Sequence, residues 1–126
     1  MGYRNQVAIK CEEKAYKKIK DVCKNVNNMP DKIYKCQNEK EYILYWDWVK
    51  WWNLDNDIKA IENALSELDK LDIKSGYGYT FMRLGEEDGD IEIRENVCYL
   101  DLFTTRKIDI PYGFEEIKVK IDKEEN

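Results

Sequence analysis

Carboxylates gather in one short stretch of the chain and are the first residues to consider for chemistry: Glu86, Glu87, Asp88, Asp90 and Glu92. Calcium and magnesium prefer oxygen ligands of this kind, and a glycosidase needs two carboxylates across the bond that it cleaves. The spacing does not follow an EF-hand loop, however, and the Asp-Gly pair is typical of a β-hairpin turn. We expect a solvated hairpin turn without a metal site, and we keep a small hydrolase acting through these acids as the weakest hypothesis.

The chain lacks histidine, which removes the most common general base and the usual partner of a serine or cysteine nucleophile. Its four cysteines form no Cys-x-x-Cys pair, so they do not resemble a zinc site: Cys11, Cys23, Cys36 and Cys98. We expect free, half-buried thiols in a reducing compartment. The sequence therefore predicts no catalytic residue, no metal and no cofactor.

All four tryptophans lie in one segment that reads as a strand, at Trp46, Trp48, Trp51 and Trp52. A strand alternates its faces with a period of two, which places Trp46 and Trp48 on one face and Trp51 on the other. One bulky face suffices for a core, and aromatic groups on the other face would serve as interface anchors. Core packing and a binding face are about equally favoured by this pattern, and we take all four as candidate binding residues.

Arginine is scarce beside lysine, and two strand arginines, Arg83 and Arg106, are candidate ligand-binding residues. A guanidinium can grip a phosphate or carboxylate through two parallel hydrogen bonds, so arginines beside aromatic rings could form a nucleotide pocket. The alternative is that they pair with the abundant acidic side chains near the ends of the sheet, and we favour that alternative.

The formal net charge of −5 and the pI near 4.9 disfavour direct nucleic-acid binding, which normally needs a basic face. A protein partner with a basic surface fits better. No apolar run approaches the roughly 18 residues of a membrane span, and the N-terminus lacks a secretory pattern, so we expect a cytoplasmic protein that binds no membrane. The sequence leaves homo-oligomerisation open.

Hydrophobic spacing predicts an α+β fold: an antiparallel β-sheet with two helices packed on one face. The most distinct helix has Ile58, Ile61, Leu65 and Leu68 on one side and Asp55 as its N-cap. We expect a single domain over residues 1–121 and a charged tail over 122–126. The helices are expected at 12–26 and 55–68, and the strands at 7–11, 32–36, 42–51, 79–84 and 90–94. One or two further strands are expected over 97–104 and 107–110, with an optional last strand at 117–121.

Several short blocks of the sequence are distinctive together: Met1-Gly2-Tyr3-Arg4, Val7-Ala8, Trp46-Asp47-Trp48-Val49-Lys50-Trp51, Ile58 to Leu68, Arg83-Leu84-Gly85-Glu86, Asp90-Ile91-Glu92 and Arg106-Lys107-Ile108. They resemble a family of small phage and prophage proteins that begin with a Met-Gly-Tyr-Arg-Ser-like stretch and have a Trp-x-x-Val-Lys-Trp centre. This chain has Asn5 where serine is usual, and the resemblance does not extend past Ile110. It implies a phage context and supplies no catalytic residue.

Phage context favours a function in which a small acidic protein binds and disables a host factor. We therefore expect a non-enzymatic accessory binding protein, such as an anti-CRISPR or other anti-defence protein, acting in the cytoplasm of the host. The alternative is a sponge that sequesters a small nucleotide messenger between aromatic rings and the strand arginines. The role against a host factor is an analogy with phage proteins in general, and the acidic charge, the aromatic strand and the missing catalytic groups are the observations behind the binding protein.

Overall fold

A computed structural model of the chain describes residues 4–26, 29–36, 40–51, 55–71, 75–87, 89–96, 103–104, 108–109 and 113–117. Its elements follow one another in the order β1 (Asn5–Glu12), α1 (Glu13–Lys24), β2 (Lys32–Cys36), β3 (Glu41–Val49), α2 (Asn56–Leu68), β4 (Tyr79–Leu84), β5 (Ile91–Glu95), β6 (Phe103–Thr104), β7 (Ile108–Asp109) and β8 (Phe114–Ile117).

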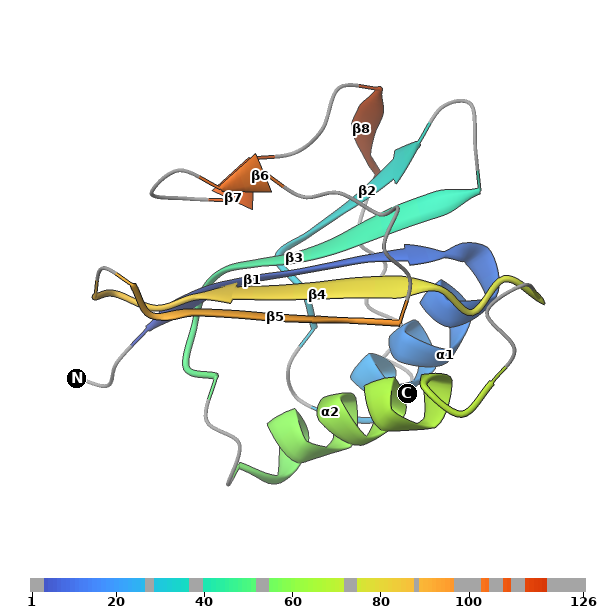
Figure 1. Ribbon diagram of the computed structural model, residues 1–126, viewed down its shortest axis with the longest axis horizontal. Coiled ribbons are helices and arrows are strands. Elements are labelled where there is room, and N and C mark those ends of the chain that lie inside the picture. Colours follow the sequence, from blue (N-terminus) through green and yellow to red (C-terminus); the bar gives the residue numbers. More distant parts are fainter. Residues whose placement is uncertain are drawn as a thin grey trace.

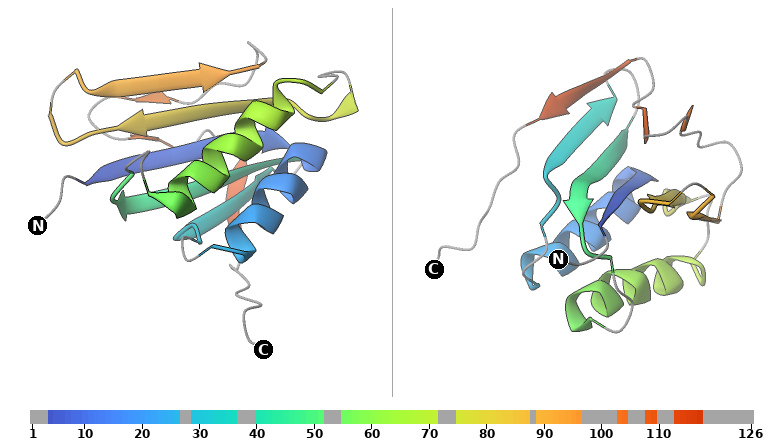
Figure 2. Two further views of the ribbon diagram at one scale, coloured as in Figure 1. Left: turned by 90° about the horizontal axis from the view of Figure 1, so that it is seen from below. Right: turned by 90° about the vertical axis from the view of Figure 1, so that its left-hand side faces the viewer.

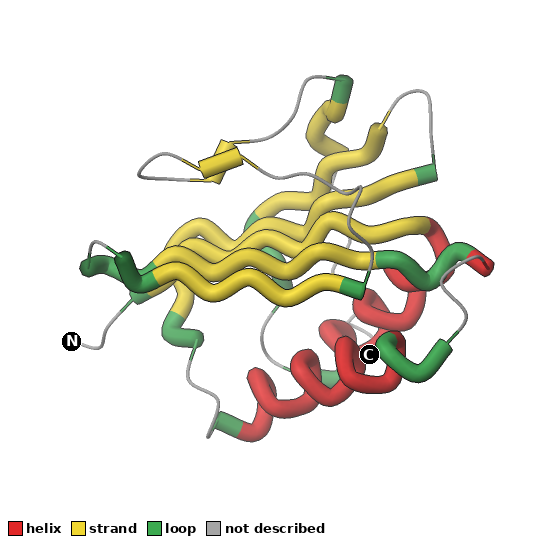
Figure 3. The backbone as a smooth tube through the Cα atoms, in the orientation of Figure 1, coloured by secondary structure: helices red, strands yellow, loops and turns green. Residues whose placement is uncertain are grey.

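Six of the strands form one antiparallel sheet in the order β5-β4-β1-β3-β2-β8, and both helices pack on the same face of it (Figures 1 and 2). This confirms the predicted α+β class. We call the opposite side of the sheet the helix-free face. β6 and β7 form a separate two-stranded antiparallel pair on that side, above β1 and β3 in Figure 1. Figure 3 shows the same two layers as helix and strand tubes.

The main core lies between the sheet and the helices because alternate residues of each central strand point to that side. On β1 these residues are Val7, Ile9 and Cys11, all with no exposed surface. They pack with the apolar stripes of the two helices, which include Ile19, Cys23, Ile58, Ile61, Leu65 and Leu68. A second, smaller cluster occupies the helix-free face and contains Ala8, Ile43, Met82 and Leu84.

The helix ends show how local sequence fixes the elements. Asp55 caps α2 as predicted, since its side chain accepts a hydrogen bond of 2.8 Å from the Asp57 N–H. α1 has no side-chain cap, and the Ala15 N–H instead donates to the Gly76 carbonyl oxygen at 3.2 Å. Gly76 can present that carbonyl because its φ of 96° lies in the left-handed region.

Strand β3 departs from the regular alternation that the sequence suggested. The register shifts between Asn5 and Val7 of β1, which pair with Val49 and Trp46 of β3. The shift is a β-bulge: between these two pairs β3 has one residue more than β1, so the side chains of β3 change face there. Val49, expected opposite Trp46, consequently packs against the same core as Trp46.

Most of the residues predicted as strand in the C-terminal part lie outside the described residues. The strand expected at 97–104 is described only at Phe103–Thr104, and that expected at 107–110 only at Ile108–Asp109. The last strand was expected at 117–121, but β8 begins earlier, at Phe114, and pairs with β2. Residues 118–126, and with them the proposed domain limit and charged tail, lie outside the described residues. Among the helices that are described, none has the length and apolar character needed to cross a membrane.

Candidate functional site

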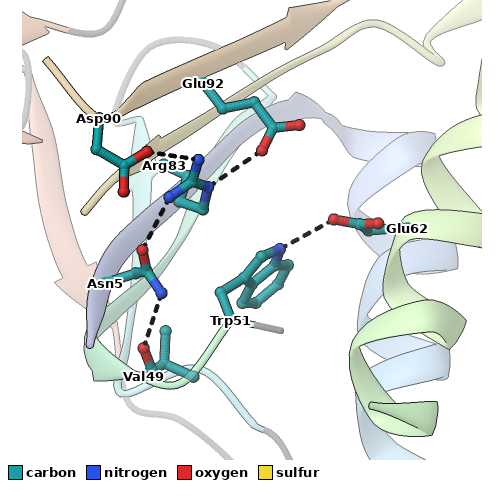
Figure 4. Close-up of polar contacts among 7 residues, drawn as sticks. All are labelled: Asn5, Val49, Trp51, Glu62, Arg83, Asp90 and Glu92. Atoms are coloured by element: carbon teal, nitrogen blue, oxygen red, sulfur yellow. Dashed lines mark hydrogen bonds and ion pairs between the residues drawn. The ribbon is translucent and has the colours of Figure 1, made fainter. Parts of the chain in front are cut away.

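Two of the candidate tryptophans belong to the core. Trp46 is 1% exposed and Trp51 is 8% exposed, and their rings meet edge to face with centroids 5.3 Å apart. The indole N–H of Trp51 donates to Glu62 Oε2 of α2 at 3.1 Å, as Figure 4 shows. This bond ties the chain after β3 to the helix layer, so neither ring forms part of a binding surface.

Trp48 has the opposite environment, with 65% of its surface exposed. The bulge in β3 explains this position, because Val49 takes the place facing the helices and its neighbour Trp48 is turned away. The two remaining candidates, Trp52 and Arg106, lie outside the described residues.

Trp48 borders a depression of about 490 Å³ at the end of the sheet where β1 begins and β4 ends. We call this depression the Trp48 hollow. It is lined by Arg4, Asn5, Gln6, Asp47, Trp48, Leu84, Gly85 and Glu86. It combines one exposed indole, one aliphatic side chain and several polar groups.

Hydrogen bonds fix the polar wall of the Trp48 hollow. The Tyr45 hydroxyl donates to Asp47 Oδ1 at 3.0 Å, and Gln6 Nε2 donates to the Tyr45 hydroxyl oxygen at 2.9 Å. The backbone N–H of Asp47 donates to Asp31 Oδ2 at 2.7 Å. Partial burial, and then the bond to Asp47, raise the pKa of Tyr45, so this phenol remains a donor at neutral pH.

The other wall of the hollow is acidic at its rim. Glu86 is exposed, and its Oε2 accepts a hydrogen bond of 3.1 Å from the backbone N–H of Arg4. Asp47 and Asp31 are exposed as well. Two exposed carboxylates, Asp47 and Glu86, therefore line the hollow beside Trp48 together with the cation Arg4, in a protein whose net charge is −5.

Arg83, the described member of the arginine pair, does not line the Trp48 hollow. Its Nη2 donates to Asp90 Oδ1 at 3.0 Å, its Nε to Glu92 Oε1 at 3.1 Å, and its Nη1 to Asn5 Oδ1 at 3.0 Å (Figure 4). Burial acts to lower the pKa of Arg83, but the bonds to the two carboxylates outweigh it and raise the pKa above its ordinary value. This is the ion pairing with nearby acids that the sequence favoured over a nucleotide pocket.

The acidic turn after β4 therefore has a structural role. Asp90 holds Arg83, and the Gly85 N–H donates to the Asp90 carbonyl oxygen at 2.8 Å, which closes the hairpin. Over the residues that the structure describes, no three acidic or cysteine side chains are grouped so that they could hold a metal ion.

The two buried thiols are not placed for chemistry. Cys11 and Cys23 are buried in the core and Cys36 is half-buried, and all three are free. Burial raises the pKa of Cys11 far above its ordinary value and that of Cys23 to about 12. A thiol held protonated in this way is a poor nucleophile.

Sequence reasoning named Trp48 as a candidate but did not name the residues around it. Tyr45 and Asp47 belong to the same strand, and their polar groups beside the tryptophans are a signal that could have been used. Gln6, Leu84 and Glu86 come from β1, from β4 and from the turn after β4, and only the pairing of the strands brings them to Trp48.

Comparisons with protein families, with curated proteins and with solved structures gave no match for this chain.

Proposed function

We propose that this protein is a non-enzymatic phage or prophage accessory protein that binds and inhibits a host factor, with the Trp48 hollow as its docking surface. The observation that carries this proposal is the indole of Trp48, which is 65% exposed while Trp46 and Trp51 are in the core. A large aromatic side chain with a polar N–H is the commonest type of interface anchor. An anti-CRISPR or other anti-defence protein in the host cytoplasm is the specific form that the resemblance favours.

Charge supports a basic protein as the partner. Asp47 and Glu86 are exposed carboxylates that line the hollow beside the one lining cation, Arg4, and the whole chain has a net charge of −5. Complementary charge at the rim of an interface speeds association and selects among partners. A polar rim around one apolar anchor also fits the usual anatomy of a protein interface.

The nucleotide sponge is less well supported by the described residues. Three of the nitrogen atoms of Arg83 already donate to Asp90, Glu92 and Asn5. A nucleotide would have to compete with two carboxylates for this guanidinium. Among the described residues, Trp51 is also unavailable to a base, because its ring is in the core and is bonded to Glu62.

The test begins with capture of partners from a bacterial lysate on tagged protein, with proteins and small molecules of the same peak identified by mass spectrometry. Affinity for the captured protein is then measured for Trp48→Ala and for Leu71→Ala. Leu71 is also an exposed large apolar residue, but it follows α2, outside the hollow. Truncation of an anchor tryptophan costs roughly 2 kcal/mol or more of binding free energy, a loss of about thirtyfold in affinity, and the Leu71 variant should bind normally.

A second pair of variants tests the charge argument. Glu86→Gln and Glu67→Gln each remove one negative charge, but Glu67 lies on α2 and only Glu86 borders the hollow. Slower association that depends on salt is expected for Glu86→Gln alone. Equal affinity of the Trp48→Ala variant and the unchanged protein would refute the docking surface, and a bound nucleotide without a protein partner would favour the sponge.

Inhibition is tested in cells. Plating of a phage that is targeted by a CRISPR system should recover when the protein is expressed in the host, and Trp48→Ala should abolish the recovery while Leu71→Ala retains it. Recovery that is insensitive to Trp48 would contradict the proposed surface.

A further inference from the structure

Strand β5 is an edge of the six-stranded sheet, and in the part of the chain that the structure describes it pairs on one side only, with β4. It also presents two large apolar side chains to solvent, since Ile91 is 48% exposed and Ile93 is 57% exposed. Their partners on β4 are Leu84 and Met82 of the helix-free cluster, so both isoleucines point to the helix-free face. An edge strand with exposed apolar residues is a template for pairing with another strand.

We propose that β5 pairs antiparallel with β5 of a second copy of this chain, about a two-fold axis that passes between the two Ile93 residues. The proposal is independent of the Trp48 hollow and concerns a different surface. It makes the protein a dimer with one continuous sheet.

The backbone of β5 is oriented for this pairing. One hydrogen-bonded residue pair lies at each end of the β4–β5 ladder. At one end the Gly85 N–H donates to the Asp90 carbonyl oxygen at 2.8 Å, and at the other the Asn96 N–H donates to the Tyr79 carbonyl oxygen at 3.3 Å. Bonded and non-bonded pairs alternate along an antiparallel ladder, so the backbone groups of Glu92 and Arg94 face β4.

The backbone groups of Ile93 and Glu95 consequently point outward from the sheet. The N–H of Ile91 is turned back to the Gly89 carbonyl oxygen at 3.0 Å, and its carbonyl is on the outward side. In the proposed dimer the two Ile93 residues exchange both of their backbone bonds. The Glu95 N–H of each copy then donates to the Ile91 carbonyl oxygen of the other.

Side-chain charges select this register. When Ile93 faces Ile93, Glu92 of each copy faces Arg94 of the other on the side of the helices. Charges on an edge strand usually discourage pairing, but here they are complementary at both positions. Glu92 is bound by Arg83 through Oε1 and is still 47% exposed. Arg94 is bound through Nη2 by Asp69, the C-cap of α2, at 3.1 Å and is still 30% exposed, so in the dimer each of the two charges would gain a second partner beside the one it has.

The neighbouring registers are unfavourable. A shift that keeps the same backbone groups outward but centres the axis on Glu92 brings two glutamates face to face, and a shift to Arg94 does the same with two arginines. Like charges directly opposite one another destabilise a strand pair. When the axis passes through Ile93, at the centre of Ile91-Glu92-Ile93-Arg94-Glu95, the two strands therefore gain both an apolar contact and opposite charges across the interface.

The geometry has two consequences for the assembly. Facing residues of antiparallel strands have their side chains on the same side, so both helix layers lie on one side of the joined sheet and both Trp48 hollows on the other. Five residues of edge strand make a small interface, so the dimer should be weak and should form with rising concentration.

The test uses the fact that residue 93 faces itself. In Ile93→Lys two ammonium groups oppose each other, and in Ile93→Glu two carboxylates do so. Each variant alone should dimerise at least tenfold more weakly than the unchanged chain, and an equimolar mixture of the two should recover a heterodimer through one Lys–Glu pair. Sedimentation equilibrium from about 10 μM to about 1 mM covers the range expected for a small interface.

Ile91→Lys is the matched control. It introduces the same charge in the same strand, but its facing residue in the second copy is Glu95, so the dimer should be retained or strengthened. Amide exchange should also slow at Ile93 and Glu95, and not at Glu92, as the concentration rises. A protein that stays monomeric throughout this range would overturn the proposal. So would a dimer that tolerates Ile93→Lys, or two Ile93 variants that fail to recover when mixed.

Discussion

Replacing Trp51 by phenylalanine separates the structural tryptophans from the proposed binding tryptophan. The indole of Trp51 is 8% exposed, lies 5.3 Å from the ring of Trp46 and 5.8 Å from that of Phe81, and donates to Glu62. Phenylalanine keeps an aromatic ring in the same space but removes the N–H donor and part of the buried surface. The expected loss therefore has two contributions that can be worked out separately.

The hydrogen bond to the carboxylate contributes about 1 kcal/mol, less than the roughly 1.5–3 kcal/mol typical of charged partners, because Glu62 is half-buried and can be rehydrated. The smaller ring gives up roughly 40 Å² of buried apolar surface, which corresponds to about 1 kcal/mol at 25 cal/mol per Å². The free energy of unfolding should fall by about 2 kcal/mol, a large part of the 5–15 kcal/mol typical of a domain. In urea this corresponds to a midpoint about 1 M lower.

Urea denaturation followed by far-ultraviolet circular dichroism measures this loss, and Trp48→Phe is the control. Because Trp48 is 65% exposed, its variant should change the free energy of unfolding by less than about 0.5 kcal/mol. Glu62→Gln keeps an acceptor for the indole N–H and should cost less than Trp51→Phe. The assignment of the two tryptophans would be refuted if Trp51→Phe were neutral, or if Trp48→Phe cost as much.

Three further outcomes are expected. Asp55→Ala removes the acceptor for the Asp57 N–H at the start of α2 and should cost about 1 kcal/mol in thermal or urea unfolding, whereas an unchanged midpoint would show that the cap does not contribute. Burial raises the pKa of Cys23 from 9.0 to about 12 and that of Cys11 in the same direction, so only the unfolded state loses these protons above pH 9. The free energy of unfolding should therefore fall between pH 9 and pH 12. Both thiols should also resist a thiol reagent until the protein unfolds. A Cys23→Ala variant with the same pH dependence as the unchanged protein would contradict the role given to the Cys23 thiol. Arg83→Lys replaces a side chain that donates to three partners by one with a single ammonium group, and it should lower the free energy of unfolding by about 1 kcal/mol. The loss should be smaller in high salt because the ion pairs are partly exposed. An unchanged free energy of unfolding would mean that this cluster adds no stability.

The regular elements were predictable because each has its own local signal. The spacing of Ile58, Ile61, Leu65 and Leu68 identified α2, and Asp55 identified its first turn, since helix periodicity and capping act within a few residues. Strands β2 and β4 were predicted with the bounds that the structure has. Two helices among antiparallel strands then indicated the α+β class with little ambiguity.

The candidate site was less predictable because it depends on one irregularity in β3. Strict alternation placed Trp48 on the face of Trp46, and the bulge instead placed Val49 there. A bulge leaves no clear mark in a sequence that is bulky on both faces. The edge position of β5 was equally hidden, because strand order depends on contacts between residues that are distant in the chain.

The sequence by itself determined the elements, the acidic charge and the absence of histidine chemistry, because composition and short-range periodicity are properties of neighbouring residues. Tertiary structure decided which tryptophan faces solvent, which carboxylates hold Arg83 and which strand is left at the edge of the sheet. These outcomes follow from strand register and order, in which a shift of one residue exchanges the buried and exposed faces.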